Sequence, residues 1–181
     1  KELLKANGIN VPESQISNSI DETFIIAKKF NSSLAIKAQI HSGGRGKAGG
    51  IKITNTPWEA KEFAASILGK NLITEQNKPH GQPVNQLLIE ETIKIKKEMY
   101  FSILIDRQEE SIVIIASESG GMDIEEISSK NPKSITKEYC KINMVLSSSQ
   151  ESRLSIGLGI EKKLFKKLEK FLTSCFELFR K

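Results

Sequence analysis

Short apolar runs along the chain, some of them alternating with polar residues, predict β-strands. Their content of Val, Ile, Leu and Phe and their length of three to eight residues are typical of strands rather than helices. These runs cover residues 34–40, 51–54, 72–74, 86–91, 98–105 and 111–117. The polar segment 106–110 is expected to close a hairpin between the last two runs. The pattern therefore predicts several short strands joined in part by hairpins.

Capping residues predict the helices of the first half. Residues 1–7 are expected to form the last turns of one helix. Ser19 and Glu22 have the spacing of a capping box, which opens a helix to about Phe30 that is expected to bury Phe24, Ile25 and Ala27. A second capping box, residues 56–59 with proline at the first helical position, opens a helix that ends near residue 68.

Two further helices are expected after residue 120. A short one is predicted from Asp123 to Ser129, directly after the pair Gly120-Gly121. A long one is predicted over residues 161–180, because its apolar residues recur every three or four positions. That apolar stripe consists of Leu164, Leu168, Phe171, Leu172, Cys175, Phe176 and Phe179. Because helices and strands alternate irregularly, the sequence predicts an α+β (mixed α/β) fold.

Residues 41–50 form a glycine-rich loop between two predicted strands. Gly44 to Gly49 fit G-x-G-x-x-G, but the dinucleotide fingerprint requires a following helix, and residues 51–54 predict a strand. The Walker pattern also fails, because Ala48 occupies the position of its Ser or Thr. Backbone amides without neighbouring side chains can cradle a phosphate, and Lys37 from the preceding strand can add charge. A flexible hairpin turn without a ligand explains the same glycines, so both interpretations stay open.

Composition narrows the class of protein. The 181 residues are 38% hydrophobic with a net charge of +5, which suits one domain or two small subdomains with a real core. Two cysteines are too few for a disulfide framework, which favours a reducing compartment. No basic block carries the aromatic residues expected of a nucleic-acid binder, and no apolar run has membrane-spanning length. The first residues contain neither an initiator Met nor a signal-peptide core, so the chain is expected to be processed or cut.

Several long motifs resemble one enzyme family in the same order. Residues 36–52, which contain Gly43-Gly44-Arg45-Gly46-Lys47-Ala48-Gly49-Gly50, closely resemble the β subunit of succinyl-CoA synthetase, also called succinate–CoA ligase. Residues 68–74, 81–90 and 97–100 extend the similarity, and 116–125 matches more weakly. The resemblance implies an ATP-grasp fold with two subdomains built on antiparallel sheets. The small subdomain is expected at 11–93, and an incomplete second subdomain at 1–10 and 94–181.

The resemblance also implies roles for individual residues, none of them catalytic on this chain. Lys37 matches the lysine that contacts the nucleotide phosphates, and Gly44-Arg45-Gly46 matches the loop that lies over them. Glu90 and the backbone of Ile93 match the segment that holds the adenine. Glu98 matches the acid that binds the ribose hydroxyls, and a carboxylate can accept a hydrogen bond from each of them.

Each of these positions also has a plainer interpretation. Lys37 could be a solvated strand residue, Glu98 an ordinary acid at a strand edge, and Glu90 the partner of Lys94. His41 could suggest a phosphohistidine, but in the family that residue belongs to the α subunit, so His41 is expected to support the loop. Members of the family usually have Glu directly before the glycine pair at 120–121, where this chain has Ser, and we therefore assign that pair no role.

The function implied is coupling of succinyl-CoA, phosphate and ADP (or GDP) to succinate, CoA and ATP (or GTP), through a phosphohistidine on the partner α subunit. Magnesium is the implied cofactor, with its protein ligands expected beyond Lys181, so this fragment alone is expected to be inactive. There are two alternatives. One is the β subunit of a malate–CoA ligase, and the other is a truncated, non-catalytic module that binds a nucleotide or a partner subunit. No nucleic-acid or membrane partner is expected, and the location is bacterial cytoplasm or mitochondrial matrix.

Overall fold

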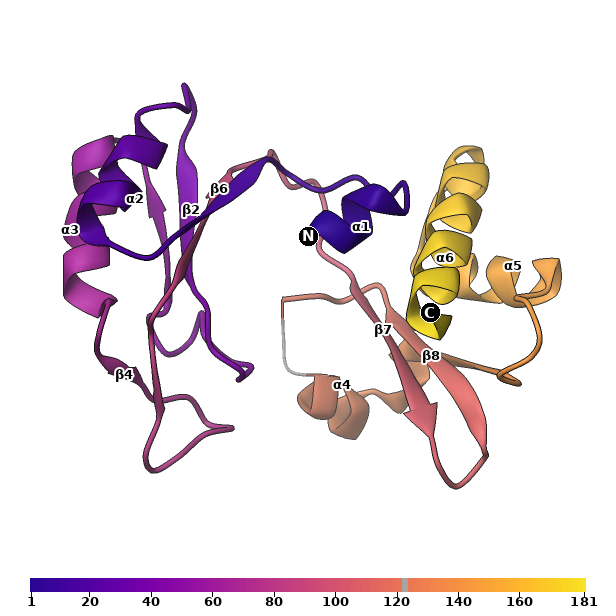
Figure 1. The fold of residues 1–181 in the computed structure, drawn as a ribbon. Coiled ribbons are helices and arrows are strands. Elements are labelled where there is room, and N and C mark those ends of the chain that lie inside the picture. Colours follow the sequence, from indigo (N-terminus) through magenta and orange to yellow (C-terminus); the bar gives the residue numbers. More distant parts are fainter. Residues whose placement is uncertain (122–123) are drawn as a thin grey trace. The chain divides into compact units, whose positions relative to one another are not determined.

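The computed structural model describes residues 1–121 and 124–181 and divides them into two compact units (Figure 1). One unit is the continuous segment Pro12–Lys94, and the other combines Lys1–Val11 with Ile95–Lys181. Each unit contains its own antiparallel sheet and its own apolar core. Assignment of the ATP-grasp subdomains to 11–93 and to 1–10 with 94–181 stays a prediction.

The unit Pro12–Lys94 is a four-stranded sheet covered on one face by two helices. In spatial order its strands are β1 (Ser14–Ser17), β6 (Leu87–Glu91), β2 (Leu34–Ala38) and β3 (Ile51–Thr54), and neighbouring strands are antiparallel. Helices α2 (Ile20–Ala27) and α3 (Pro57–Ile67) lie side by side on the sheet (Figure 1). A small second sheet pairs β4 (Asn71–Leu72) with β5 (Gln82–Pro83).

The first turns of α2 and α3 are capped as the sequence predicts. Ser19 Oγ accepts from the Glu22 backbone N–H at 3.2 Å, while the Glu22 carboxylate accepts from the Asn18 N–H at 2.7 Å.

The expected burial along α2 is partly wrong, because Ile25 is 58% exposed whereas Ile26 is 4% exposed. The helical period turns Ile26 and Ala27 toward the sheet and leaves Ile25 on the outer face.

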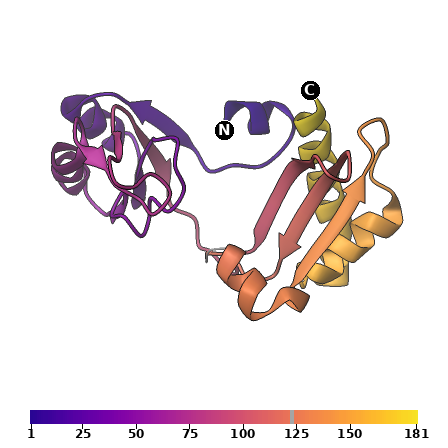
Figure 2. The ribbon, with the colours of Figure 1, turned by 90° about the horizontal axis from the view of Figure 1, so that it is seen from below.

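The second unit is a three-stranded sheet, also covered on one face by two helices (Figure 2). The strands β7 (Tyr100–Asp106), β8 (Ser111–Ser117) and β9 (Ile135–Cys140) are antiparallel, with β8 in the centre. The covering helices are α5 (Ser148–Gly157) and α6 (Phe165–Arg180), and α1 (Glu2–Ala6) contacts α6. Shorter elements are α4 (Ile124–Lys130) and the 3-10 turns η1 (Pro132–Ser134) and η2 (Lys162–Leu164).

The final helix packs its predicted stripe against the sheet. Leu172 and Phe176 are almost fully buried in the core beneath β8, whereas Leu164 and Phe179 at the two ends are exposed. The expected helix at 123–129 corresponds to α4, while Asp123 lies outside the described residues. Strands β1 and β9 and helix α5 had no counterpart in the sequence prediction.

A salt bridge with two hydrogen bonds fixes α5 to β9. Arg153 donates from Nε to Glu138 Oε1 at 2.6 Å and from Nη2 to Glu138 Oε2 at 2.9 Å. These hydrogen bonds raise the pKa of the Arg153 guanidinium, against a smaller lowering by burial. The planar guanidinium matches both carboxylate oxygens, so the pair sets the position of the helix on the strand.

Candidate functional site

Strand β2 has one face against the helices and one face away from them. Leu34, Ile36 and Ala38 belong to the core beneath α2 and α3, so the alternation of a strand places Ala35 and Lys37 on the opposite face. The register puts Lys37 beside Leu88 of β6 and Ile51 of β3 on that face. Lys37 is therefore a cation in the middle of a mostly apolar open sheet surface.

Glu90 of β6 lies on the same face and forms an ion pair with Lys37. The Lys37 Nζ to Glu90 Oε1 distance is 2.7 Å, and the two side chains are 27% and 11% exposed. The residues are diagonal neighbours across the two strands, since Glu90 stands opposite Ala35. Burial makes this carboxylate depend on nearby cations, while the ammonium group of Lys37 remains partly accessible from the open face.

The glycine-rich loop 41–50 is a compact turn that returns the chain from β2 to β3. Its end is closed by backbone hydrogen bonds from Gly50 N–H to Arg45 O and from Ala38 N–H to Gly50 O, each 2.7 Å. Gly44 has φ +74°, a backbone conformation that residues with side chains rarely adopt. Among the described residues, the amides of Gly44, Arg45 and Gly46 donate to no other protein group. Three consecutive amides are thus available to an acceptor such as phosphate.

Arg45 does not simply extend into solvent. Its Nη1 donates to Ala38 O at 2.7 Å, so the half-buried side chain folds back on the end of β2. The contact holds the tip of the loop beside the strand that carries Lys37. A guanidinium has five N–H donors, so this one bond leaves most of them able to contact an anion.

Ile93 follows β6 in the segment that leads to the second unit. Its side chain is 61% exposed. The preceding residue anchors this segment, because the Thr92 N–H and hydroxyl both donate to Ser33 O, at 3.0 and 2.9 Å. These two hydrogen bonds therefore hold the backbone in place directly before Ile93.

Glu98 belongs to the second unit, two residues before β7, and is exposed. Gly120 and Gly121 pack directly against it. Gly120 N–H donates to Glu98 O at 3.0 Å, and a Cβ on Gly120 would lie 2.6 Å from the Met99 backbone. A Cβ on Gly121 would lie 2.5 Å from Glu98 Oε2. The glycine pair, which was assigned no role from its motif, thus makes room for Glu98.

Among the residues that the structure describes, the remaining reactive side chains form no second centre of chemistry. His41 and His80 are exposed. Burial raises the pKa of the Cys140 thiol, with an opposing effect of Arg180, and burial also raises the pKa of the Cys175 thiol. Neither thiol is therefore activated as a nucleophile. In the part of the chain that the structure describes, no three His, Cys, Asp or Glu residues gather as a metal site would require.

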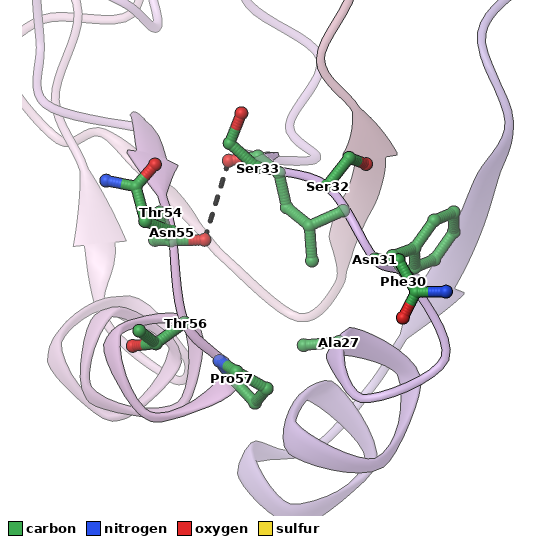
Figure 3. Close-up of a pocket in the computed structure, with 10 residues that line it drawn as sticks. Ala27, Phe30, Asn31, Ser32, Ser33, Thr54, Asn55, Thr56 and Pro57 are labelled. Carbon is green, nitrogen blue, oxygen red and sulfur yellow. Dashed lines mark hydrogen bonds between the residues drawn. The ribbon is translucent and has the colours of Figure 1, made fainter.

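A pocket of about 320 Å³ opens at the other end of β2 (Figure 3). Its rim carries Ser32, Ser33 and Thr54, and all three hydroxyls already have partners within the unit: Ser32 donates to Glu91, Ser33 pairs with Thr92, and Thr54 donates to Leu34 O. None of the predicted site residues lines this pocket. We therefore regard it as a structural hollow.

Comparison with known families decides which fold the two units form. The family described as "ATP-grasp domain" matches residues 1–181, the whole chain. The chain belongs to the ATP-grasp family. The predicted α+β ATP-grasp fold with antiparallel sheets is thereby confirmed.

Relatives of this ATP-grasp chain carry the name expected from its motifs. The protein named "Succinate--CoA ligase [ADP-forming] subunit beta" of Brevibacillus brevis is 43% identical over 180 residues, covering 99% of this chain and 47% of the relative. The protein of the same name from Bacillus subtilis is 41% identical with the same coverage. The chain spans about half the length of the curated relatives it matches. The resemblance to this β subunit is confirmed.

A solved structure supports the fold independently. The crystal structure of PH1788 from Pyrococcus horikoshii superposes with a TM-score of 0.66 at 16% identity, covering 98% of this ATP-grasp chain and 73% of PH1788. At that identity the likeness concerns the fold alone. In the described residues, no helix is long and apolar enough to cross a bilayer.

Proposed function

We propose that this chain is the nucleotide-binding part of a succinate–CoA ligase β subunit. The full enzyme would convert succinyl-CoA, phosphate and ADP into succinate, CoA and ATP, with a phosphohistidine on a partner α subunit carrying the phosphoryl group between steps. The single observation that carries the proposal is the unit Pro12–Lys94, where Lys37 on an open sheet face precedes a loop with three available amides. The names of the curated relatives favour succinate over malate and ADP over GDP.

Positioning and neutralisation of charge are the work proposed for these residues. Catalysis of phosphoryl transfer consists mainly of aligning the reacting groups and stabilising the negative charge on the phosphoryl oxygens. A lysine and backbone amides can do both. Lys37 would contact the phosphates as a compact cation, held toward the open face by Glu90 at 2.7 Å. The amides of Gly44, Arg45 and Gly46 would lie over the same oxygens.

The other end of the nucleotide is assigned to three positions. Glu98 would accept hydrogen bonds from the ribose hydroxyls, as an exposed carboxylate can. The backbone at Ile93 would hold the adenine, and Glu90, the last residue but one of β6, would support this segment while it orients Lys37. The side chain of Ile93 is exposed and has no hydrogen-bonding group, so hydrogen bonds to adenine at this position would come from the backbone.

Magnesium is the cofactor that the family implies. Among the described residues, no three His, Cys, Asp or Glu side chains form a group that could hold a metal ion. Magnesium often keeps several waters and binds through phosphate oxygens, with one or two carboxylates from the protein. We therefore derive no step through the metal from this chain.

Calorimetric titration with ADP and with GDP, each with magnesium present, tests the proposal. ADP is expected to bind in the micromolar range that is common for enzyme substrates, about 1 µM to 1 mM, and more tightly than GDP. Absence of binding by both nucleotides would overturn the proposed function. Tighter binding of GDP would overturn the ADP assignment alone.

Substitution of Gly121 by alanine is expected to weaken ADP binding with little added loss of stability. The new methyl group would displace the Glu98 carboxylate, which lies 2.5 Å from the Cβ position. The matched control is Gly69→Ala, since Gly69 has φ +74° against +72° for Gly121 but no atom within 4 Å of its Cβ position. Backbone strain should lower the unfolding free energy of both variants by about 1 kcal/mol, whereas only Gly121→Ala should bind ADP more weakly. Equal affinities of the two variants would contradict this role of Glu98.

A further inference from the structure

A second segment of the same unit, residues 72–77, holds the glycine-rich loop 41–50 in place. Gln76 Oε1 accepts a hydrogen bond from the Gly43 backbone N–H at 2.7 Å, although the two residues are 33 positions apart in sequence. Beside this contact, Ser42 Oγ and Thr74 Oγ1 form a hydrogen bond of 2.6 Å. The start of the loop is therefore tied to the chain that follows β4.

Two glycines of the loop serve this contact rather than a ligand. A Cβ on Gly43 would lie 2.7 Å from Gln76 Oε1, and a Cβ on Gly50 would lie 2.5 Å from Leu72 Cδ2. By contrast, Cβ positions on Gly44 and Gly46 have no neighbour closer than 3.8 Å. Gly43 and Gly50 thus leave room for segment 72–77 to pack against the loop, while Gly44 and Gly46 leave the available amides uncovered.

Gln76 is itself presented by a closed turn. Asn77 Oδ1 accepts from the Thr74 backbone N–H at 2.7 Å, and Asn77 Nδ2 donates to Leu72 O at 3.1 Å. The Asn77 backbone N–H also donates to Thr74 O at 3.2 Å. An asparagine that bonds its own neighbouring backbone is a common way to fix a turn. Gln76 therefore approaches Gly43 from a prearranged position.

We propose that Gln76 is a positioning residue for the phosphate-binding loop, an inference that rests on the proposed function. By holding Gly43, it fixes the direction in which the amides of Gly44, Arg45 and Gly46 point. A loop that is ordered before the ligand arrives loses less conformational entropy on binding, and the affinity is higher for that reason. Gln76 touches the loop and has no role in the chemistry itself.

The test combines hydrogen exchange with nucleotide affinity in the full protein. For Gln76→Ala, exchange of the peptide covering residues 41–50 without nucleotide is expected to accelerate about three- to tenfold, and the Kd for Mg-ADP to rise by a similar factor. The KM for nucleotide should rise while kcat changes little, because the reacting groups are untouched. The matched control is Gln86→Ala, which removes a side chain that donates to Asn18 Oδ1 at 2.9 Å elsewhere in the unit.

Gln76→Glu separates positioning from a general loss of structure. Its carboxylate keeps an oxygen acceptor for the Gly43 N–H, so exchange of the loop should remain slow. The added negative charge beside the phosphate site should still weaken Mg-ADP binding. This loss of affinity should shrink at high salt, because salt screens the repulsion between the Glu carboxylate and the phosphates. Fast exchange in this variant would contradict the assigned hydrogen bond.

The outcomes distinguish the two proposals. If the wild-type protein binds no nucleotide but Gln76→Ala still accelerates exchange of the loop, the proposed function fails and the structural contact stands. If the wild-type protein binds Mg-ADP and Gln76→Ala changes neither exchange nor affinity, the positioning role is overturned while the proposed function stands. An equal effect of Gln86→Ala would also overturn it.

Discussion

Replacing Lys37 with methionine is expected to reduce affinity for Mg-ATP by about tenfold to a hundredfold. A hydrogen bond to a charged group contributes about 1.5–3 kcal/mol, and each 1.4 kcal/mol corresponds to about tenfold in the dissociation constant. Methionine has nearly the length of lysine and is apolar, so the variant removes the charge while it keeps most of the packing. Isothermal calorimetry with Mg-ATP measures the loss directly.

The same substitution should also lower stability, and the design must separate the two effects. Glu90 is only 11% exposed and has Lys37 at 2.7 Å, so removal of the ammonium group is expected to cost about 1.5–3 kcal/mol of unfolding free energy. The double variant Lys37→Met with Glu90→Gln should recover part of this stability but none of the affinity. Lys52→Met, on an exposed lysine of β3, is the control for loss of one charge from the sheet. Wild-type affinity in Lys37→Met would refute the assignment of Lys37 to the phosphates.

Replacing Glu98 with alanine is expected to weaken Mg-ATP binding by about ten- to thirtyfold, because two hydrogen bonds to the ribose are lost and each contributes about 0.7–1 kcal/mol at a carboxylate that is screened by solvent. Stability should change little, since Glu98 is exposed. The sharper measurement compares ATP with its 2′,3′-dideoxy analogue, which has neither hydroxyl. The wild-type protein should prefer ATP, and Glu98→Ala should bind both ligands alike.

The control for this experiment is Glu109→Ala, which removes an exposed acid from the turn between β7 and β8. It should leave both affinities at the wild-type value. A variant at Glu98 that keeps the full preference for ATP over the dideoxy analogue would show that the carboxylate does not contact the ribose. The ordinary strand-edge interpretation of Glu98 would then be correct.

Local signals in the sequence predicted much of the fold. The hairpin around the glycine loop, the caps of α2 and α3 and the buried stripe of α6 each depend on residues that are close in the chain. Strand β1 was missed because Ser-Gln-Ile-Ser has a single apolar residue, and it becomes a strand only by pairing with β6. Ile25 was expected inside α2 because hydrophobicity alone does not tell which side of a short helix faces the sheet.

The site was predictable only as a set of separate residues. Lys37 and Glu90 were assigned to opposite ends of the nucleotide, yet they form one ion pair across 53 residues of sequence. No local pattern reveals that contact, since it follows from the register of β2 against β6. Gln76 was missed for the same reason, although the polar cluster Thr74 to Asn77 after a short strand was a visible signal.

The division of the chain has a consequence for the order in which the protein can fold during synthesis. The unit Pro12–Lys94 is continuous, so all of its contacts are available once the ribosome has released that segment. Helix α1 packs on α6, and Asn7 Oδ1 accepts from Lys181 Nζ at 2.8 Å, 174 residues later. Helix α1 must therefore wait for α6 before it can pack, while the unit Pro12–Lys94, which is made between them, is free to fold first.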